Sequence, residues 1–565
     1  MSNELISGSD ILLKSLLAED VDTIFGYPGG QVIPIFDRLY DYKKDFNYML
    51  VRHEQGATHA AQGYARACGK VGVCLVTSGP GATNTITGIA DAMLDSTPIV
   101  VIMGQVPSSM LGTDAFQEVD VVGITSPITK WSYQIRNIDE ISEAVAKAFY
   151  IANTGRKGPV VLDFTKNAQI EKSVFSQKKC EFIRSYIPVP DVNEKKVYQA
   201  ADLINNSKKP LMLVGQGVIL SEAEKEVMAL AEKADIPMAF TLMGESAIPT
   251  AHPLNKGMLG MHGNVGPNSK TNEADLLIAV GMRFSDRVTG NLKTYAKQAK
   301  IIHFDIDPSE IGKNVPVDVA VLGDAKETIK MVGDIIKPNK HTEWIESFKV
   351  QEEKEFTRVI QKELYSDKPY LTMGEAVNKI SEATNHEAIL VTDVGQNQIA
   401  AARYFKFKNT RSMITSGGLG TMGFGIPAAI GAKIAQPNKT VCMFCGDGGF
   451  QMTMQELGTI MQYKVGVKMI ILNNNKLGMV RQWQELFFNE RYSSTNMENP
   501  NFGLIAESYK IRHSEVHTRE ELDAAIADML SDDEAYLLTV NVEEKGLIYP
   551  MIPAGASVSN ILLNK

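Results

Sequence analysis

Two polar side chains, Asp447 and Asn474, each follow an apolar run of strand-like composition in the last third of the chain. The run 441–445 ends in Gly446-Asp447-Gly448-Gly449, and the run 467–472 ends in Asn473-Asn474-Asn475. In a right-handed crossover, the turns after two adjacent parallel strands meet at the same edge of the sheet. We therefore expect the Asp447 carboxylate to lie beside the Asn474 amide.

A carboxylate and an amide oxygen at such an edge are ligands for a hard divalent cation. Mg²⁺ takes oxygen ligands in near-octahedral geometry and is usually shared with phosphate. The neighbouring glycines would let phosphate oxygens approach the backbone, and a following helix, expected around 454–463, would point its N-terminal amides toward the anion. Gly-Asp-Gly alone is more often a plain turn. Here strand-like runs anchor both ends, with 24 residues between Gly448 and Asn473.

Strands alternate with helices along the whole chain. Apolar runs at 48–51, 71–76, 99–103, 276–280, 301–307 and 389–392 read as further strands, each followed by a turn and a helix-like segment. This alternation predicts an α/β protein built from three doubly wound, mostly parallel sheets. We expect domains at 1–180, 190–340 and 369–565, with a polar linker at about 171–193 and a charged, helix-like linker at 341–367.

The stretch from Gly446-Asp447-Gly448 to Asn473-Asn474 resembles the diphosphate-binding signature of thiamine-diphosphate enzymes. The resemblance implies Mg²⁺ held by Asp447, Asn474 and the backbone carbonyl of Lys476. It further implies that the Gly420 carbonyl meets the aminopyrimidine and that Met422 holds the cofactor bent. The implied contacts of this domain to thiamine diphosphate are Gly395, Gln396, Asn397, Gly420, Met422, Gly446, Asp447, Gly448, Gly449, Asn474, Gly478 and Met479.

Glu54 lies in Arg52-His53-Glu54-Gln55-Gly56-Ala57, between a predicted strand and a helix rich in small residues. Such small residues predict that another element packs closely against this helix. A Glu at a helix start usually does no more than favour the helix dipole. The segment resembles the activating-glutamate motif of thiamine-diphosphate enzymes, which implies that Glu54 hydrogen-bonds the aminopyrimidine and promotes loss of the C2 proton. That role requires a poorly solvated carboxyl with a raised pKa.

Stretches 111–118, 477–484 and 549–556 closely resemble acetohydroxyacid synthases, also called acetolactate synthases, and the resemblance spans nearly the whole chain. It implies that Phe116 and Gln117 line the active site and that Lys166 belongs to the substrate region. It also implies that Trp483 shapes the pocket for the second keto acid, an effect worth about 1–3 kcal/mol per methylene. The implied catalytic set is Glu54, Phe116, Gln117, Lys166 and Trp483.

Segments of the middle domain resemble the FAD-binding domain of the same synthases. The implied FAD contacts are Arg156, Gly215, Gly217, Thr241, Leu242, Met261, His262, Arg283 and Asp305. Five positions depart from the residues that relatives usually carry: Thr165, Asn167, Gln216, Ser285 and Asn397. Asn397 replaces a His, so it still forms hydrogen bonds but cannot titrate near neutrality. The alternative for this domain is a Rossmann-like fold without a ligand, because fold does not fix function.

Composition narrows the class of protein. The chain has 565 residues, 44% of them hydrophobic, and a formal net charge of −9, which argues against a nucleic-acid binder that works by bulk electrostatics. We find no signal peptide and no run of about 18 apolar residues, so no membrane partner is expected. The five cysteines lack zinc-finger spacing, and Cys442 and Cys445 are expected to be buried thiols in a cytoplasmic protein.

The resemblance implies the large, catalytic subunit of a biosynthetic acetohydroxyacid synthase with thiamine diphosphate, Mg²⁺ and a structural FAD. Such an enzyme decarboxylates pyruvate and transfers the two-carbon unit to pyruvate or 2-oxobutyrate in branched-chain amino acid biosynthesis. A homodimer or tetramer is expected, with the cofactor between two chains and a small regulatory subunit as a further partner. The alternatives are a flavin-using pyruvate oxidase, a catabolic acetolactate synthase without FAD, a non-catalytic paralogue and a nicotinamide dehydrogenase, the last disfavoured by an incomplete glycine fingerprint.

Overall fold

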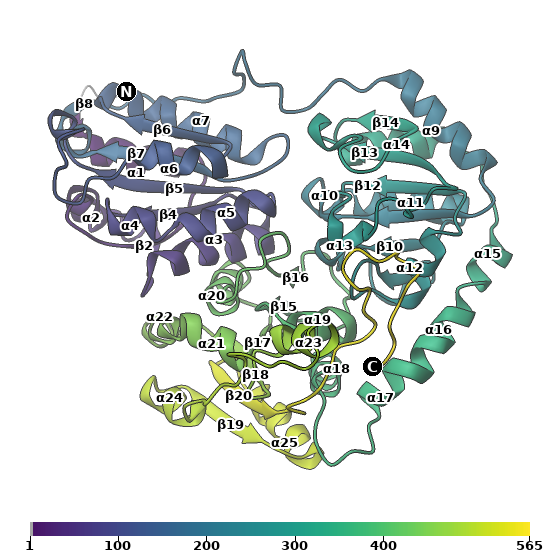
Figure 1. Cartoon of the computed structure of the whole chain (residues 1–565). Helices are drawn as coiled ribbons and strands as arrows, with labels where there is room; N and C mark the ends of the chain where they lie inside the picture. The colour runs from purple at the N-terminus through teal and green to yellow at the C-terminus, as the bar shows by residue number, and fades with distance from the viewer. Residues whose placement is uncertain (1–3) are drawn as a thin grey trace.

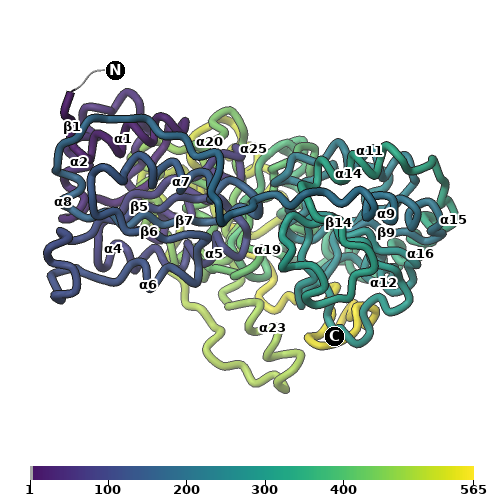
Figure 2. Tube along the Cα trace, turned by 90° about the horizontal axis from the view of Figure 1, so that it is seen from above, coloured from purple at the N-terminus to yellow at the C-terminus, as the bar shows by residue number. Residues whose placement is uncertain are grey.

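Three parallel six-stranded sheets form the framework of the computed structural model, which describes residues 4–565 (Figure 1). Each sheet is flanked by the helices that connect its strands, so the α/β class predicted from the alternation of strands and helices is confirmed. Viewed from above, the first and second sheets lie at opposite ends of the molecule, and the chain around residues 478–500 projects beyond them (Figure 2).

The first sheet has the strand order β3-β2-β4-β5-β7-β6. Its strands are β2 (Thr23–Tyr27), β3 (Asn47–Leu50), β4 (Gly72–Val76), β5 (Ile99–Gln105), β6 (Trp131–Ile135) and β7 (Val160–Thr165). Its helices are α1 (Gly8–Ala18), α2 (Ile33–Leu39), α3 (Glu54–Cys68), α4 (Pro80–Thr83), α5 (Ile86–Leu94), α6 (Val121–Thr125), α7 (Ile141–Asn153) and α8 (Lys166–Ile170). A short antiparallel pair, β1 (Leu5–Ser7) with β8 (Lys172–Val174), extends into the predicted linker.

The second sheet has the order β11-β10-β9-β12-β13-β14. Its strands are β9 (Pro210–Val214), β10 (Met238–Phe240), β11 (Asn255–Met258), β12 (Leu276–Val280), β13 (Lys300–Asp305) and β14 (Val319–Leu322). Its helices are α9 (Glu194–Asn206), α10 (Gln216–Leu220), α11 (Glu224–Ala234), α12 (Val265–Thr271), α13 (Asp286–Thr289) and α14 (Ala325–Ile335). The charged segment that follows is helical, as predicted, in α15 (Thr342–Glu346), α16 (Lys349–Glu355) and α17 (Gln361–Leu364).

The third sheet has the order β16-β15-β17-β18-β20-β19. Its strands are β15 (Ile389–Thr392), β16 (Met413–Ile414), β17 (Val441–Gly446), β18 (Val467–Asn473), β19 (Arg512–Val516) and β20 (Tyr536–Asn541). Its helices are α18 (Met373–Ala383), α19 (Gln396–Tyr404), α20 (Gly425–Ala435), α21 (Asp447–Thr453), α22 (Leu457–Tyr463), α23 (Gly478–Phe487), α24 (Phe502–Ser508) and α25 (Arg519–Met529). The helix expected around 454–463 is present as a 3₁₀ turn at Met454–Glu456 followed by α22, and a further helix, α21, begins at Asp447 itself.

The first and third sheets share one hydrophobic core, in which α3 packs directly on α20. The contact is backbone to backbone: a Cβ on Gly63 would lie 1.9 Å from the Ala428 carbonyl oxygen, and one on Gly431 would lie 1.8 Å from that of Ala60. The predicted close partner of the small-residue helix is therefore α20. Cys442 and Cys445 are buried free thiols of β17, as expected. No helix within residues 4–565 combines the length and apolarity needed to cross a membrane.

Candidate active site

Asp447 and Asn474 lie at the same edge of the third sheet. Strands β17 and β18 are adjacent and parallel, with Gly446 opposite Leu472, so the residues that follow both strands emerge together. Both side chains are buried. Burial raises the pKa of the Asp447 carboxyl, whereas a hydrogen bond from Asn499 opposes that rise. A buried carboxylate beside an amide oxygen is a donor set suited to Mg²⁺.

Asn499 connects the two turns. Its Nδ2 donates to Asp447 Oδ2 at 2.7 Å, to Asn473 Oδ1 at 3.0 Å and to Asn475 Oδ1 at 3.1 Å. The Lys476 backbone N–H donates to Asn474 Oδ1 at 3.2 Å, which places the Lys476 peptide next to the same amide. Within residues 4–565 there is no group of three or more His, Cys, Asp and Glu side chains suited to a metal, so a cation here needs amide and carbonyl oxygens as well.

A cradle of glycines faces this edge from α19, β17 and α23. Gly395 has a φ of 129° and precedes α19, and Gln396 Oε1 in the first turn of that helix accepts from Asn474 Nδ2 at 3.3 Å. A Cβ on Gly446 would lie 3.2 Å from Asn397 Nδ2, and one on Gly478 would lie 2.1 Å from Gln396 Oε1. Asn397 Oδ1 is buried and has no hydrogen-bond partner in the described chain. The space beside these glycines fits a bound diphosphate, whereas Asn397 Oδ1 is an acceptor and would need a donor rather than a phosphate oxygen.

The glycine loop, residues 415–425, lies between this cradle and the first domain. The buried Asp393 carboxylate accepts the backbone N–H groups of Val394 at 2.8 Å, Gly423 at 3.0 Å and Gly425 at 2.9 Å. Burial raises the pKa of the Asp393 carboxyl, although these three N–H groups oppose the rise. A Cβ on Gly448 would lie 3.7 Å from the Met422 Cε, so Met422 reaches the Asp447 turn.

A cavity of about 950 Å³ opens where the three domains meet. Most residues implied to contact FAD line it: Arg156, Gly217, Thr241, Leu242, Met261, His262, Arg283 and Asp305. The third domain contributes Gly395, Gly420, Met479 and Trp483 to the same wall. Gly215 lies behind the lining, where its Cβ would be 2.2 Å from the Gly281 carbonyl oxygen, so this glycine permits a close approach of two strand ends.

Two cavity residues have their polar groups engaged by the protein. Arg156 forms ion pairs with Asp307 at 3.1 Å and Glu310 at 3.0 Å, which fixes its guanidinium at the cavity edge. The Nδ1 of His262 lies 3.1 Å from the Pro550 carbonyl oxygen, and burial lowers the pKa of the imidazole to about 4. His262 is therefore neutral near pH 7 and offers a hydrogen bond rather than a charge.

Glu54 begins α3, and two neighbours fix its position. Asn84 Nδ2 donates to Glu54 Oε2 at 2.9 Å. The buried Glu456 carboxylate, from the third domain, accepts the backbone N–H groups of Arg52 at 3.0 Å and His53 at 3.1 Å. The chain immediately before Glu54 is thus held by another domain, and Glu54 Oε1 is the carboxylate oxygen left for a ligand.

Within one chain, the implied catalytic residues fall into two groups: Trp483 lines the cavity, and the other four do not. Trp483, on α23, lines the cavity with its ring 5.1 Å from that of Phe487. Glu54, Phe116, Gln117 and Lys166 are absent from the residues that line it. Phe116 is 83% exposed, Gln117 has a φ of 61°, and Lys166 Nζ donates to the Gly30 carbonyl oxygen at 3.2 Å.

Sequence reasoning missed Asp393, Glu456 and Asn499. Asp393 had a readable signal, because Asp393-Val394-Gly395 follows strand β15 just as Asp447-Gly448-Gly449 follows β17. Asn499 lies in an irregular segment 52 residues from Asp447, and Glu456 acts on a segment more than 400 residues earlier. No local pattern connects residues at such separations.

The chain matches the family descriptions of thiamine pyrophosphate enzymes in three consecutive segments. The N-terminal TPP binding domain matches residues 6–124, the central domain matches 197–332, and the C-terminal TPP binding domain matches 393–540. Together these segments cover most of the chain, and each contains one of the three sheets or the greater part of it.

Curated relatives are similar over nearly their full length. The chain is 44% identical over 576 residues to the probable acetolactate synthase large subunit of Methanococcus aeolicus, covering 99% of this chain and 95% of the relative. It is 44% identical over 552 residues to the acetolactate synthase large subunit of Lactococcus lactis, covering 97% and 95%. It is 41% identical over 564 residues to the acetolactate synthase isozyme 2 large subunit of Escherichia coli, covering 99% of both chains.

Proposed function

The chain belongs to the thiamine pyrophosphate enzymes and, among them, to the acetolactate synthase large subunits, and from that premise we propose what it catalyses. It decarboxylates pyruvate and transfers the two-carbon unit to a second pyruvate, which gives 2-acetolactate for branched-chain amino acid biosynthesis. The observation that carries this proposal is the placement of Asp447 and Asn474 at one sheet edge, opposite the glycine cradle.

Asp447, Asn474 and the Lys476 carbonyl would hold Mg²⁺, and the cradle around Gly446 and Gly478 would hold the diphosphate. When bound, thiamine diphosphate supplies the nucleophilic carbon to which the two-carbon unit of pyruvate is attached. Met422 would press on the cofactor from the side of the Asp447 turn. Asn397 would donate through Nδ2 to a phosphate oxygen, which an amide can do at any pH.

Glu54 would hold a proton at Oε1 and exchange it with a ring nitrogen of the aminopyrimidine. Asn84 supports this role because it occupies Oε2 and so fixes the rotation of the carboxyl group. The backbone contacts of Glu456 fix the start of α3 as well. A general acid–base group that is held in this way typically contributes a factor of about 10²–10⁴ to the rate.

FAD would occupy the large cavity as a structural group. The volume, the eight lining residues implied by the resemblance, and the ordered Arg156 guanidinium support this assignment. The same wall carries Trp483, so the acceptor pocket borders the flavin. Trp483 limits the acceptor by size, and we extend the proposal to 2-oxobutyrate as a second acceptor, giving 2-aceto-2-hydroxybutyrate.

A second copy of the chain would complete each site. Glu54, Phe116, Gln117 and Lys166 do not line the cavity that contains Trp483, and the 83% exposed Phe116 leaves an apolar surface to be covered. This supports a homodimer, or a tetramer made of such dimers. Relatives are named large subunits, which supports a small regulatory subunit as a further partner. The free state of the five cysteines fits a reducing, cytoplasmic compartment.

A product assay under exclusion of oxygen tests the function. Purified protein receives pyruvate, thiamine diphosphate and Mg²⁺, with and without FAD. Acetolactate and CO₂ that form only with FAD support the proposal. Acetolactate at full rate without bound or added flavin points to a catabolic synthase, and acetate or acetyl phosphate after admission of oxygen points to a pyruvate oxidase.

Two variants test the assigned roles in the same assay. Glu54→Gln should lower turnover about 10²-fold or more with the fold intact, and unchanged turnover would remove Glu54 from the mechanism. Asp447→Ala should abolish Mg²⁺-dependent retention of thiamine diphosphate during dialysis. Normal retention by this variant would break the metal assignment.

A further inference from the structure

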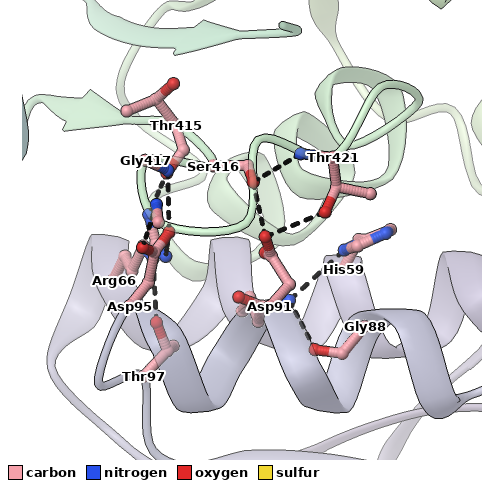
Figure 3. A network of polar contacts seen from close by, with 12 residues as sticks. His59, Arg66, Gly88, Asp91, Asp95, Thr97, Thr415, Ser416, Gly417 and Thr421 are labelled. Atoms are coloured by element: carbon pink, nitrogen blue, oxygen red, sulfur yellow. Dashed lines mark hydrogen bonds and ion pairs between the residues drawn. The ribbon is translucent and has the colours of Figure 1, made fainter. Parts of the chain in front are cut away.

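Two buried aspartates of the first domain reach across to the glycine loop of the third domain (Figure 3). Asp91 lies in α5, and Asp95 is the residue directly after that helix. Asp95 Oδ2 accepts the Gly417 backbone N–H at 2.9 Å, and its Oδ1 accepts that of Gly418 at 2.7 Å. Both oxygens of Asp95 therefore hold backbone of the loop.

Asp91 holds the side chains at the two ends of the same turn. Its Oδ1 accepts the Ser416 hydroxyl and, at 3.0 Å, the Thr421 hydroxyl. The Ser416 Oγ in turn accepts the Thr421 backbone N–H at 2.8 Å, which closes the turn on itself. Within residues 4–565, Asp91 Oδ2 has no hydrogen-bond partner. The two aspartates thus differ: Asp95 uses both oxygens, and Asp91 uses one.

Arg66, near the end of α3, completes the contact. Its Nη2 forms an ion pair with Asp95 at 2.8 Å, its Nη1 donates to the Thr415 carbonyl oxygen, and its Nε donates to Thr97 Oγ1 at 3.0 Å. One buried cation thus faces two buried carboxyl groups. Burial raises the pKa of both Asp91 and Asp95, whereas Arg66 opposes that rise.

The central domain also contacts this loop closely. A Cβ on Gly417 would lie 2.3 Å from the Met243 Sδ of the central domain. One on Gly418 would lie 2.9 Å from Asp95 Oδ1 and 3.4 Å from Arg283 Nη2. Residues 416–420 line the large cavity, and Gly420, with a φ of 72°, lies directly beyond the held glycines. The first domain therefore holds the residues on both sides of Leu419 and Gly420, namely Gly418 and Thr421.

We propose that Asp91 and Asp95 are positioning residues of the cofactor site, which hold the loop 416–421 so that Gly420 and Met422 meet the aminopyrimidine of thiamine diphosphate. The inference rests on the proposed function, because it assumes that this cofactor binds. Asp95 positions the loop through its backbone, and Asp91 closes the turn that Ser416 and Thr421 frame.

Because Asp95 uses both carboxylate oxygens and Asp91 uses one, variants of the two residues can distinguish a positioning role from a general packing role. Asn has one acceptor oxygen. Asp91→Asn keeps the single oxygen that accepts the Ser416 and Thr421 hydroxyls, so exchange in the loop and affinity for the cofactor should stay near their wild-type values, whereas Asp91→Ala should change both. Asp95→Asn must leave Gly417 or Gly418 without an acceptor and weakens the pairing with Arg66. Asp163→Asn, a buried carboxylate of β7 in the same domain that does not touch the loop, is the matched control.

The first measurement is amide hydrogen exchange in cofactor-free protein, followed by mass spectrometry of peptides that cover 412–424. We expect exchange in this segment to rise about tenfold in Asp95→Asn and Asp91→Ala, and to stay at the wild-type rate in Asp91→Asn and Asp163→Asn. The second is the Kd for thiamine diphosphate with Mg²⁺, followed by quenching of tryptophan fluorescence. This Kd should rise about tenfold in Asp95→Asn and Asp91→Ala and stay unchanged in Asp91→Asn and Asp163→Asn.

Wild-type protein that fails to bind thiamine diphosphate would defeat the proposed function. Wild-type binding together with normal exchange and normal Kd in Asp95→Asn would overturn the positioning role alone. Equal defects in Asp91→Asn and Asp95→Asn would also overturn it, because a general loss of buried charge would then explain both. If Asp91→Ala fails to fold, the comparison of the two Asn variants still decides the question.

Discussion

The Glu456 carboxylate accepts the backbone N–H of His53 at 3.1 Å, although 403 residues separate the two in sequence. Glu456 belongs to the third domain, and His53 directly precedes Glu54 in the first. Asp95, the residue directly after α5, makes the converse contact, from the first domain to the glycine loop of the third. Each of these domains therefore positions the part of the other that is expected to meet thiamine diphosphate.

Loss of the Glu456 carboxylate should lower turnover without unfolding the chain. Glu456→Ala leaves the partly buried N–H groups of Arg52 and His53 without an acceptor, and each such group costs up to about 1–3 kcal/mol. The start of α3 should then shift, and turnover should fall about tenfold or more. The turnover of Glu456→Gln should fall less, because the amide oxygen of Gln can still accept both N–H groups while its Nε2 faces the Thr459 hydroxyl. Steady-state kinetics and circular dichroism of both variants check this, and wild-type turnover in Glu456→Ala would contradict it.

Because α3 and α20 touch through their backbones, one methyl group added at this contact should destabilise the folded chain strongly. In Gly431→Ala the new Cβ would lie 1.8 Å from the Ala60 carbonyl oxygen, so the two helices must separate. We expect a loss of about 3 kcal/mol or more in the free energy of unfolding, seen as a lower Tm or a failure to accumulate folded protein.

Gly333→Ala is the matched control for that substitution. Gly333 lies in α14, and nothing lies within 4 Å of its built Cβ. Because Ala has the higher helix propensity, this variant should gain about 0.5–1 kcal/mol. Equal Tm values for the two variants would mean that α3 and α20 do not touch through their backbones.

The strands and the edge that carries Asp447 and Asn474 could be predicted from the sequence, because apolar runs mark buried strands and crossover handedness then determines which turns are neighbours. The cofactor contacts came from resemblance to a family, not from residue spacing. The contacts of Asp95 and Glu456 with other domains could not be predicted. They depend on the packing of α3 against α20, and periodicity describes single elements rather than how two domains dock.

Trp483 should control which acceptor is used. It lines the cavity from α23, and its ring packs against that of Phe487. Trp483→Leu enlarges the acceptor pocket, so the ratio of 2-aceto-2-hydroxybutyrate to acetolactate should change by about 5–150-fold, corresponding to 1–3 kcal/mol. Competition between pyruvate and 2-oxobutyrate measures the ratio. Phe487→Leu, which contacts Trp483 but does not line the cavity, should change it far less, and an identical ratio in Trp483→Leu would refute the selectivity role.

The buried Asp163 should make the stability of the first domain depend on pH. Burial raises the pKa of Asp163 to about 6 from its ordinary value of 3.8, and hydrogen bonds from Gln134 at 2.6 Å and Gln105 at 3.2 Å only partly offset this. Because the folded pKa lies above the unfolded one, the native state keeps a proton that the unfolded state has lost. Stability therefore falls as pH rises from about 4 to 6, by about 3 kcal/mol in total.

Asp163→Asn removes this dependence, since Asn does not titrate and can still accept from both Gln side chains through one oxygen. Its advantage over the wild type in the free energy of unfolding should grow by about 1–1.5 kcal/mol between pH 5 and pH 8 and change little above that. Thermal unfolding of both proteins across this range isolates the effect, because every other titrating group cancels in the difference. A difference in Tm that stays constant from pH 5 to pH 8 would show that Asp163 is already ionised in the folded protein at pH 5.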